Sequence, residues 1–145
     1  VEILEAAYPV MFTRWALRPD SGGPGRHRGG LGAIYEIELL EEQADVFLFG
    51  ERGRFAPPGV LGGERAALNR FSVIRKDGSA EIPPMASKWV GIKLAKNESV
   101  RLETPGGGGY GPANERPRSS IERDIESGYV TRDAALRAYG KTGAT

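Results

Sequence analysis

The sequence predicts a mainly β protein, an antiparallel sandwich or distorted barrel with long glycine-rich loops and two short C-terminal helices. Three observations lead to this prediction. Apolar and polar residues alternate along several short segments, glycine is concentrated in three long loops, and helix-capping signals occur only after about Pro117. We expect one domain overall, with a β domain over residues 1–116 that carries the loops and a helical tail over residues 117–145 packed on it.

The clearest strand signal lies at residues 35–39, where three apolar side chains alternate with two glutamates. This is the pattern of a strand with one buried face. Residues 8–17 are also predicted to be extended. Residues 45–50 contain the run Val-Phe-Leu-Phe, which indicates a strand buried on both faces.

The second half of the β region contains three more candidate strands. The first, residues 71–75, is followed by Asp77-Gly78, a strong signal for a tight turn. Every second residue is apolar over 90–94 and again over 99–103. The connection at residues 96–98 is short enough for a hairpin between these two strands.

The tail carries signals for two short helices. The first begins with a capping box, places two isoleucines on one face and stops at a glycine. The second begins at a capping threonine and runs to about Tyr139. The residues concerned are Ser119 and Glu122 for the capping box, Ile121 and Ile125 for the face, Thr131 for the second cap, and Gly128 and Gly140 for the two stops.

Composition excludes several classes of protein. The formal net charge is only +1, which argues against a nucleic-acid binder. The chain has no cysteine, so disulfides and thiolate-ligated metals are excluded. No apolar run approaches the roughly 20 residues of a membrane span, and no signal peptide is visible. We therefore expect a cytoplasmic protein without a membrane partner, and the start at Val1 indicates a piece of a longer chain.

The three glycine-rich loops, at residues 18–32, 53–63 and 104–112, are the strongest candidates for function. Successive glycine N–H groups can bind an anion, and arginine guanidinium groups can hold a carboxylate. The alternative is that the loops have only a structural role, as tight crossings between strands. The candidate residues for substrate or anion binding are Asp20, Ser21, Arg26, Arg28, Thr104, Gly107, Gly108 and Tyr110.

No catalytic residue can be assigned from these loops. His27 is the only histidine, so a multi-histidine metal site is excluded and no metal ligand is predicted. Gly25 to Gly30 has the glycine spacing of a P-loop but continues with Leu31 instead of lysine. We expect no cofactor on this part of the protein.

Taken in order, the loops resemble the hydantoinase B/5-oxoprolinase family. Residues 20–32 read DSGGPGRHRGGLG, residues 57–63 read PPGVLGG and residues 104–111 read TPGGGGYG, each similar to a family stretch. Residues 124–135, DIESGYVTRDAA, resemble the helix pair that closes the family's sequences. Four such segments in order make the resemblance specific, and they place this chain at the C-terminal end of a longer B-type protein.

The resemblance implies a C-terminal part of an ATP-dependent cyclic-amide hydrolase of the hydantoinase or 5-oxoprolinase type. ATP and a divalent metal are implied for the full complex. The implied partners are the upstream part of the same B-type chain and a hydantoinase A type subunit or domain, and homo-oligomerisation stays open.

Two roles follow for the chain within that complex. It contributes either to the lining of an active site built mostly elsewhere or to subunit assembly. The alternative is a structural domain of a related ATP-dependent ketone carboxylase that never touches substrate. In all these cases we expect the isolated chain to be inactive.

Overall fold

The computed structural model describes residues 1–140, which fall into two compact units. Unit 1 comprises residues 1–16, 33–54 and 69–103, and unit 2 comprises residues 17–32, 55–68 and 104–140. The sequence analysis divided the chain at residue 116, into a β domain and a helical tail. The two units instead alternate along the chain, because the glycine-rich loops belong to the same unit as the C-terminal helices. Residues 141–145 of the expected tail lie outside the described residues.

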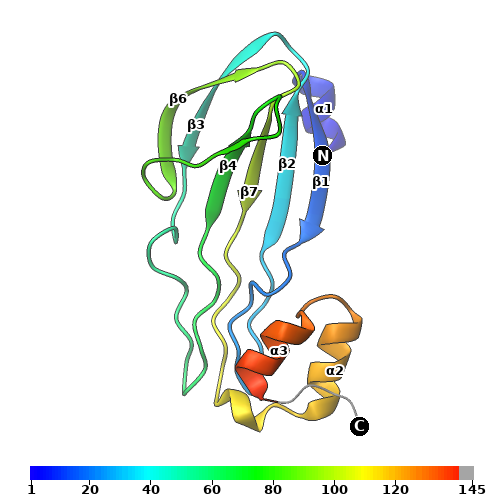
Figure 1. Ribbon diagram of the computed structural model, residues 1–145, viewed down its shortest axis with the longest axis vertical. Coiled ribbons are helices and arrows are strands. Elements are labelled where there is room, and N and C mark those ends of the chain that lie inside the picture. Colours follow the sequence, from blue (N-terminus) through cyan, green and yellow to red (C-terminus); the bar gives the residue numbers. More distant parts are fainter. Residues whose placement is uncertain (141–145) are drawn as a thin grey trace. The chain divides into compact units, whose positions relative to one another are not determined.

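Unit 1 is built on two β-sheets (Figure 1). The first has the strand order β1-β2-β7-β4-β5, and the second pairs β3 with β6. The pairs β2–β7, β4–β7, β4–β5 and β3–β6 are antiparallel. The strands are β1 (Val10–Leu17), β2 (Ala33–Leu39), β3 (Gln43–Phe49), β4 (Arg70–Ile74), β5 (Ala80–Glu81), β6 (Lys88–Ala95) and β7 (Ser99–Glu103).

One apolar core joins the two sheets. Its buried side chains come from β2, β3, β4 and β6: Leu39, Leu48, Phe71, Val73, Ile92 and Leu94. Each such side chain contributes roughly 1.5–3 kcal/mol through burial. The prediction of a mainly β fold is confirmed, and within residues 1–140 it takes the form of two sheets sharing a core, not a closed barrel.

Two details of the predicted strands were wrong. Strand β3 is not buried on both faces, because Leu48 is buried on the core while Phe47 and Phe49 are 59% and 76% exposed on the opposite face. In β6, Ile92 is buried as expected but Val90 is 64% exposed. The cause is a shift of the β3–β6 register beside Gly91, whose φ of +71° reverses the alternation at that point.

The predicted hairpin at residues 96–98 is also wrong, because β6 and β7 belong to different sheets. This connection instead packs on the equally short connection between β2 and β3. Asn97 N–H donates to the Leu39 carbonyl at 2.8 Å, and Lys96 N–H donates to the Glu42 carbonyl at 3.1 Å. The tight turn at Asp77-Gly78 is confirmed: it joins β4 to β5, and Gly78 N–H donates to the Arg75 carbonyl.

Helix α1 (Glu2–Ala7) contradicts the expectation that helix occurs only after Pro117. It has six residues, buries none of them and has no side-chain N-cap, so the capping signals used for the prediction are missing from its sequence. Among residues 1–140 there is no helix whose length and apolar content would allow it to cross a membrane.

Unit 2 brings the three glycine-rich loops together. Gly23 N–H donates to the Gly107 carbonyl at 2.8 Å, which joins the first loop to the third. Glu64, the residue after the second loop, donates its N–H to the Pro24 carbonyl at 2.7 Å, and Val60 N–H donates to the Gly109 carbonyl at 2.9 Å, which joins the second loop to both. The loops therefore form a backbone hydrogen-bond network outside the regular sheets.

The helices of unit 2 are η1 (Ala113–Glu115), α2 (Arg118–Glu126) and α3 (Arg132–Tyr139). The threonine cap is confirmed, since Thr131 accepts from Ala134 N–H, and α3 ends at Gly140 with φ of +60°. The predicted capping box is wrong. Helix α2 begins earlier, with Pro117 as N-cap, and Glu122 pairs with Arg118 instead of capping Ser119.

Candidate functional site

All eight candidate residues lie in unit 2, and the loops that carry them are in contact. Asp20 joins the first loop to α3. Its two carboxylate oxygens accept hydrogen bonds from Thr131, one from the N–H at 2.8 Å and one from the hydroxyl at 2.9 Å. Asp20 adopts a φ of +58°. The carboxylate therefore holds the start of α3 and is engaged within the chain.

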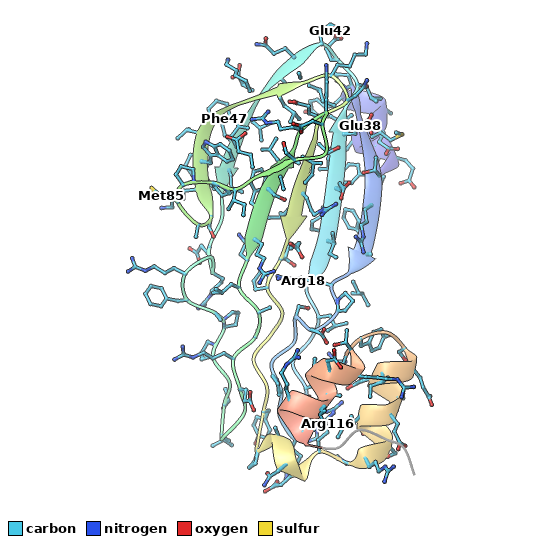
Figure 2. The ribbon with its side chains drawn as sticks, viewed as in Figure 1. Arg18, Glu38, Glu42, Phe47, Met85 and Arg116 are labelled. Carbon is cyan, nitrogen blue, oxygen red and sulfur yellow. The ribbon has the colours of Figure 1, made fainter. Side chains whose placement is uncertain are left out.

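Ser21 is fully buried at a junction of the loops. Its hydroxyl donates to the Arg18 carbonyl at 2.6 Å and accepts from Gly32 N–H at 2.8 Å. The Arg18 guanidinium, labelled in Figure 2, donates to the carbonyls of Leu68 and Thr104 at 2.7 and 2.9 Å. Ser21 and Arg18 thus connect both ends of the first loop with the start of the third loop and with the segment that follows the second.

Arg28 contacts a buried carboxylate on α2. Its Nε and Nη2 lie 3.1 and 3.3 Å from the two oxygens of Asp124, and its Nη1 donates to the Gly29 carbonyl. Arg116, also labelled in Figure 2, donates to the same Asp124 at 2.6 Å. Arg116 and Asp124 are 8% and 4% exposed. Two arginines from different segments therefore share one carboxylate in a desolvated cluster.

Arg26 and Tyr110 are more accessible. The Arg26 guanidinium lies 3.7 Å from Glu115, with both side chains about half exposed. Tyr110 pairs with His27 through reciprocal backbone hydrogen bonds of 2.9 and 3.0 Å, and its ring lies 6.0 Å from the His27 ring. These two side chains are exposed, as Asp20 is, whereas Ser21 is buried.

Gly107 and Gly108 lie where backbone meets backbone. Gly107 N–H donates to the Gly30 carbonyl at 2.9 Å. A Cβ at Gly108 would overlap the carbonyl of Pro58, and a Cβ at Gly29 would overlap the carbonyl of Gly107. The Thr104 carbonyl accepts from Arg18. Gly108 and Gly29 are thus required for close packing of the loops, whereas a Cβ at Gly107 would make only ordinary contacts.

A small pocket of about 240 Å³ opens in unit 2 between the loops and α3. Asp20 and Arg65 provide its charged side chains, and its other walls include Val130, Ala134 and Tyr139. Burial is the main cause that raises the pKa of the Tyr139 phenol above its ordinary value of 10.0. The phenol is therefore neutral at physiological pH.

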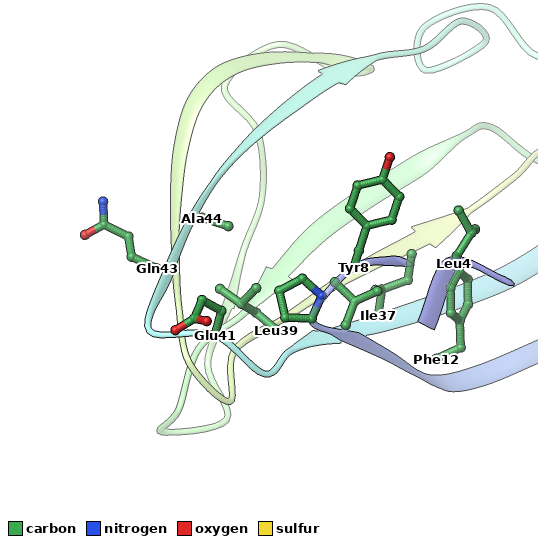
Figure 3. Close-up of a pocket in the computed structure, with 10 residues that line it drawn as sticks. Leu4, Tyr8, Phe12, Ile37, Leu39, Glu41, Gln43 and Ala44 are labelled. Atoms are coloured by element: carbon green, nitrogen blue, oxygen red, sulfur yellow. The ribbon is translucent and has the colours of Figure 1, made fainter. Parts of the chain in front are cut away.

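A second pocket, of about 340 Å³, lies in unit 1 (Figure 3). Its walls are mostly apolar and come from α1, the start of β1 and the segment from β2 to β3: Leu4, Tyr8, Pro9, Val10, Phe12, Ile37, Leu39, Glu41, Gln43 and Ala44. It has the character of a packing surface, because Glu41 is the only charged residue in its walls.

Two observations concern the metal and the ATP that are implied for the full complex. Among residues 1–140 no group of three or more His, Cys, Asp or Glu residues could hold a metal ion. The N–H groups of Gly23, Gly107 and Gly109 donate to carbonyls elsewhere in the loop region, so these three are not open to a phosphate. No step through ATP or a metal is therefore assigned to these residues.

Sequence reasoning missed Arg18, Arg116 and Tyr139 as members of the site region. For Asp124 a signal was present, because it lies three residues after the buried Ile121 and so shares its helix face. The local sequence does not single out Arg18 or Arg116. The carbonyl groups that Arg18 binds are remote in sequence, whereas Asp124 lies on the helix that follows Arg116.

Comparison with known proteins identifies the family. The family model for hydantoinase B/oxoprolinase matches residues 1–113. The beta subunit of the Pseudomonas jessenii caprolactamase is 33% identical over 142 residues, covering 97% of this chain and 24% of that protein. The 5-oxoprolinase of Dictyostelium discoideum is 38% identical over 111 residues, covering 77% of this chain and 8% of that protein.

The same fold occurs in solved structures. The ATP-dependent caprolactamase of Pseudomonas jessenii matches with a TM-score of 0.89 and 32% identity, over 99% of this chain and 25% of that chain. Acetone carboxylase matches with a TM-score of 0.78 at 23% identity, a likeness of fold alone. The chain thus spans a quarter or less of the length of these relatives, and by its sequence match it belongs to the hydantoinase B/oxoprolinase family.

Proposed function

We propose that this chain is the C-terminal part of an ATP-dependent cyclic-amide hydrolase of the cytoplasm and that it serves assembly of that enzyme. The relatives favour hydrolysis, since proteins named as a caprolactamase, a 5-oxoprolinase and a D-/L-hydantoinase are each at least 30% identical to it. The likeness to acetone carboxylase, at 23% identity, is one of fold alone.

One observation carries the assembly role. The residues that form the family signature bind one another: Asp20 binds Thr131, Ser21 binds Arg18 and Gly32, and Arg28 binds Asp124. Groups engaged in this way position backbone and are not free to meet a substrate. The partners in this proposal are the upstream part of the same B-type chain and a hydantoinase A type subunit.

The pocket beside Asp20 supports the second candidate, lining of an active site. It places the Arg65 guanidinium in a concave site, and a guanidinium can hold the carboxylate that ring opening of a cyclic amide produces. Arg65 is exposed, so its substitution tests this candidate without disturbing the loop network.

The experiment compares the isolated chain with a reconstituted enzyme. ATP turnover is measured with hydantoin, 5-oxoproline and caprolactam, first for the chain alone and then after mixing with the upstream part and the A-type subunit. We expect no turnover by the chain alone and turnover in the mixture. Steady turnover by the chain alone would contradict the proposal.

Two variants separate assembly from site lining. Arg65→Ala removes the pocket cation, and Arg123→Ala removes a comparably exposed arginine on α2, outside the pocket. If the chain serves assembly, both variants keep the parent kcat and KM once the complex is saturated. A change in KM or kcat confined to Arg65→Ala would establish site lining instead.

A further inference from the structure

The apolar pocket of unit 1, drawn in Figure 3, is an open groove of about 340 Å³. Two of its wall residues, Leu4 and Tyr8, are 46% and 59% exposed. Leu40, whose N–H donates to the carbonyl of the wall residue Pro9, is 42% exposed. Large apolar side chains that stay exposed together in this way mark an interaction surface.

Helix α1 borders the groove without filling it. The helix has six residues and buries none of them, and its Ile3 is 84% exposed. An isolated helix shorter than about 12 residues is marginal in water. The helix therefore depends on packing, of which its own apolar side chains find little among residues 1–140.

The groove is also acidic. Its walls come from residues 1–12 and 37–44, and these two segments contain no lysine or arginine but five glutamates: Glu2, Glu5, Glu38, Glu41 and Glu42. Glu42 pairs with Lys96, whereas Glu41, on the groove wall, is exposed and accepts from the N–H of Glu42. A segment with apolar side chains and a lysine or arginine beside them is complementary to this surface.

We propose that the groove holds such a segment of the upstream part of the same B-type chain, with its cation facing Glu41. This inference rests on the proposed function, in which the upstream part is joined to Val1. Val1 directly precedes α1, as the N label in Figure 1 shows. Leu4 lies three residues further on, or roughly 4.5 Å along the helix axis. About two residues of extended chain span that distance, so the groove is within reach.

The length of the relatives favours this occupant over a separate protein. The beta subunit of the Pseudomonas jessenii caprolactamase matches 97% of this chain, but the match covers only 24% of that protein. Most of such a polypeptide therefore lies outside the matched region. A segment joined to α1 by a short linker has an effective concentration on the order of millimolar beside the groove, an advantage that a separate subunit lacks.

The test uses the full-length B-type chain with one cysteine introduced at a time. Residues 1–145 contain none. Leu4→Cys reports on the groove, and Ile82→Cys is the matched control, because Ile82 is an exposed aliphatic residue of unit 1 outside the groove. Leu4 and Ile82 are 46% and 74% exposed, a difference of less than about twofold. A maleimide, followed at each site by mass spectrometry, should label Leu4→Cys about tenfold more slowly or slower still.

Two further measurements test the charge and the helix. Glu41→Lys, added to Leu4→Cys, should speed its labelling, whereas Glu51→Lys, at an exposed glutamate outside the groove, should not. Hydrogen exchange needs no substitution and so holds even if a variant fails to fold. In the full-length chain the amides of α1 should exchange as slowly as those of the core strand β4, although α1 buries no residue of its own.

Two outcomes would overturn the proposal. Equal labelling of Leu4→Cys and Ile82→Cys in the full-length chain would show that the groove stays open. Slow labelling of Leu4→Cys that appears only after the A-type subunit is added would assign the groove to that subunit. ATP turnover, measured on the same samples after the A-type subunit is added, separates this inference from the proposed function. An open groove in a complex that turns over ATP refutes the groove assignment alone.

Discussion

The two units of this chain are held together in different ways. Unit 1 packs apolar side chains between sheets, with Val73, Ile92 and Leu94 nearly inaccessible to solvent. Unit 2 packs backbone against backbone in its loops, where glycine leaves no side chain between neighbouring strands of chain. It adds a small apolar cluster around Ile121 and Ala135 in its helices.

The contrast explains why the loops look like a functional motif. A core of apolar side chains tolerates many combinations of residues with a similar total volume. The strands of unit 1 therefore carry only an alternation of apolar and polar residues, without a fixed motif. A backbone-packed region accepts no Cβ at its contacts, so it requires glycine at fixed positions. The recognisable signature of the chain can therefore arise from packing alone.

The largest effect is expected at the buried ion cluster of unit 2. Asp124→Asn keeps the side-chain shape but leaves Arg28 and Arg116 without their shared carboxylate. Removing one partner of a buried pair costs about 3–5 kcal/mol. Urea unfolding should show this loss. The control is Glu122→Gln, which breaks the exposed pair with Arg118 and should cost no more than about 1 kcal/mol. If Asp124→Asn and Glu122→Gln lower the free energy of unfolding equally, burial of the cluster does not contribute to stability.

The next effect concerns two adjacent glycines. Gly29→Ala places a Cβ on the carbonyl of Gly107, whereas Gly30→Ala meets nothing within 4 Å. Overpacking costs typically about 1–3 kcal/mol, and Gly29→Ala should lie at the upper end because its obstacle is backbone. Thermal unfolding by circular dichroism compares the two variants. If both are equally stable, unit 2 does not depend on close backbone packing.

Unit 1 should respond more weakly to a change of one methyl group. Ile92→Val removes a methyl from a side chain that is 2% exposed, and such changes typically cost about 0.5–1.5 kcal/mol. The same unfolding measurement applies. A cost for Ile92→Val above that of Gly29→Ala would reverse the proposed contrast between side-chain and backbone packing.

The sequence predicted unit 1 better than unit 2, for physical reasons. Alternation reports which face of a strand is buried, and β4 follows it, with Phe71 and Val73 buried. In β2 it fails, because Ile34 and Leu39 are both buried although they alternate out of step. It fails where the register shifts, as at Gly91, and it cannot tell which sheet a strand joins, so the connection at residues 96–98 was assigned to a hairpin.

For unit 2 the sequence located the loops but not their contacts. The pairing of Gly23 with Gly107 joins two loops that are remote in sequence, and neither residue indicates its partner. The helix caps at Thr131 and Gly140 were predictable because a cap is local. The candidate residues were found by composition, which does not separate a ligand-binding arginine from one that binds Asp124.

The smallest effect should appear in the ion pairs of unit 1, which are partly exposed, unlike the Asp124 cluster. Glu98 accepts from Ala95 N–H at 2.9 Å and pairs with Arg75 at 2.9 Å. The Ala95 N–H first, and Arg75 in addition, hold the pKa of Glu98 below its ordinary value of 4.5. A carboxyl group with a depressed pKa stabilises the fold above its unfolded pKa and loses that contribution as the pH falls through its folded pKa.

Glu98→Gln keeps the shape of the side chain and an oxygen that can accept from Ala95, but it does not titrate. The parent should therefore be the more stable protein near neutral pH, and the difference should shrink as the pH falls below about 4.5, the ordinary pKa of the group. Urea unfolding of both proteins at a series of acidic pH values measures this difference. A gap that stays constant well below the usual range of a glutamate would show that the charge of Glu98 contributes nothing to the stability of unit 1.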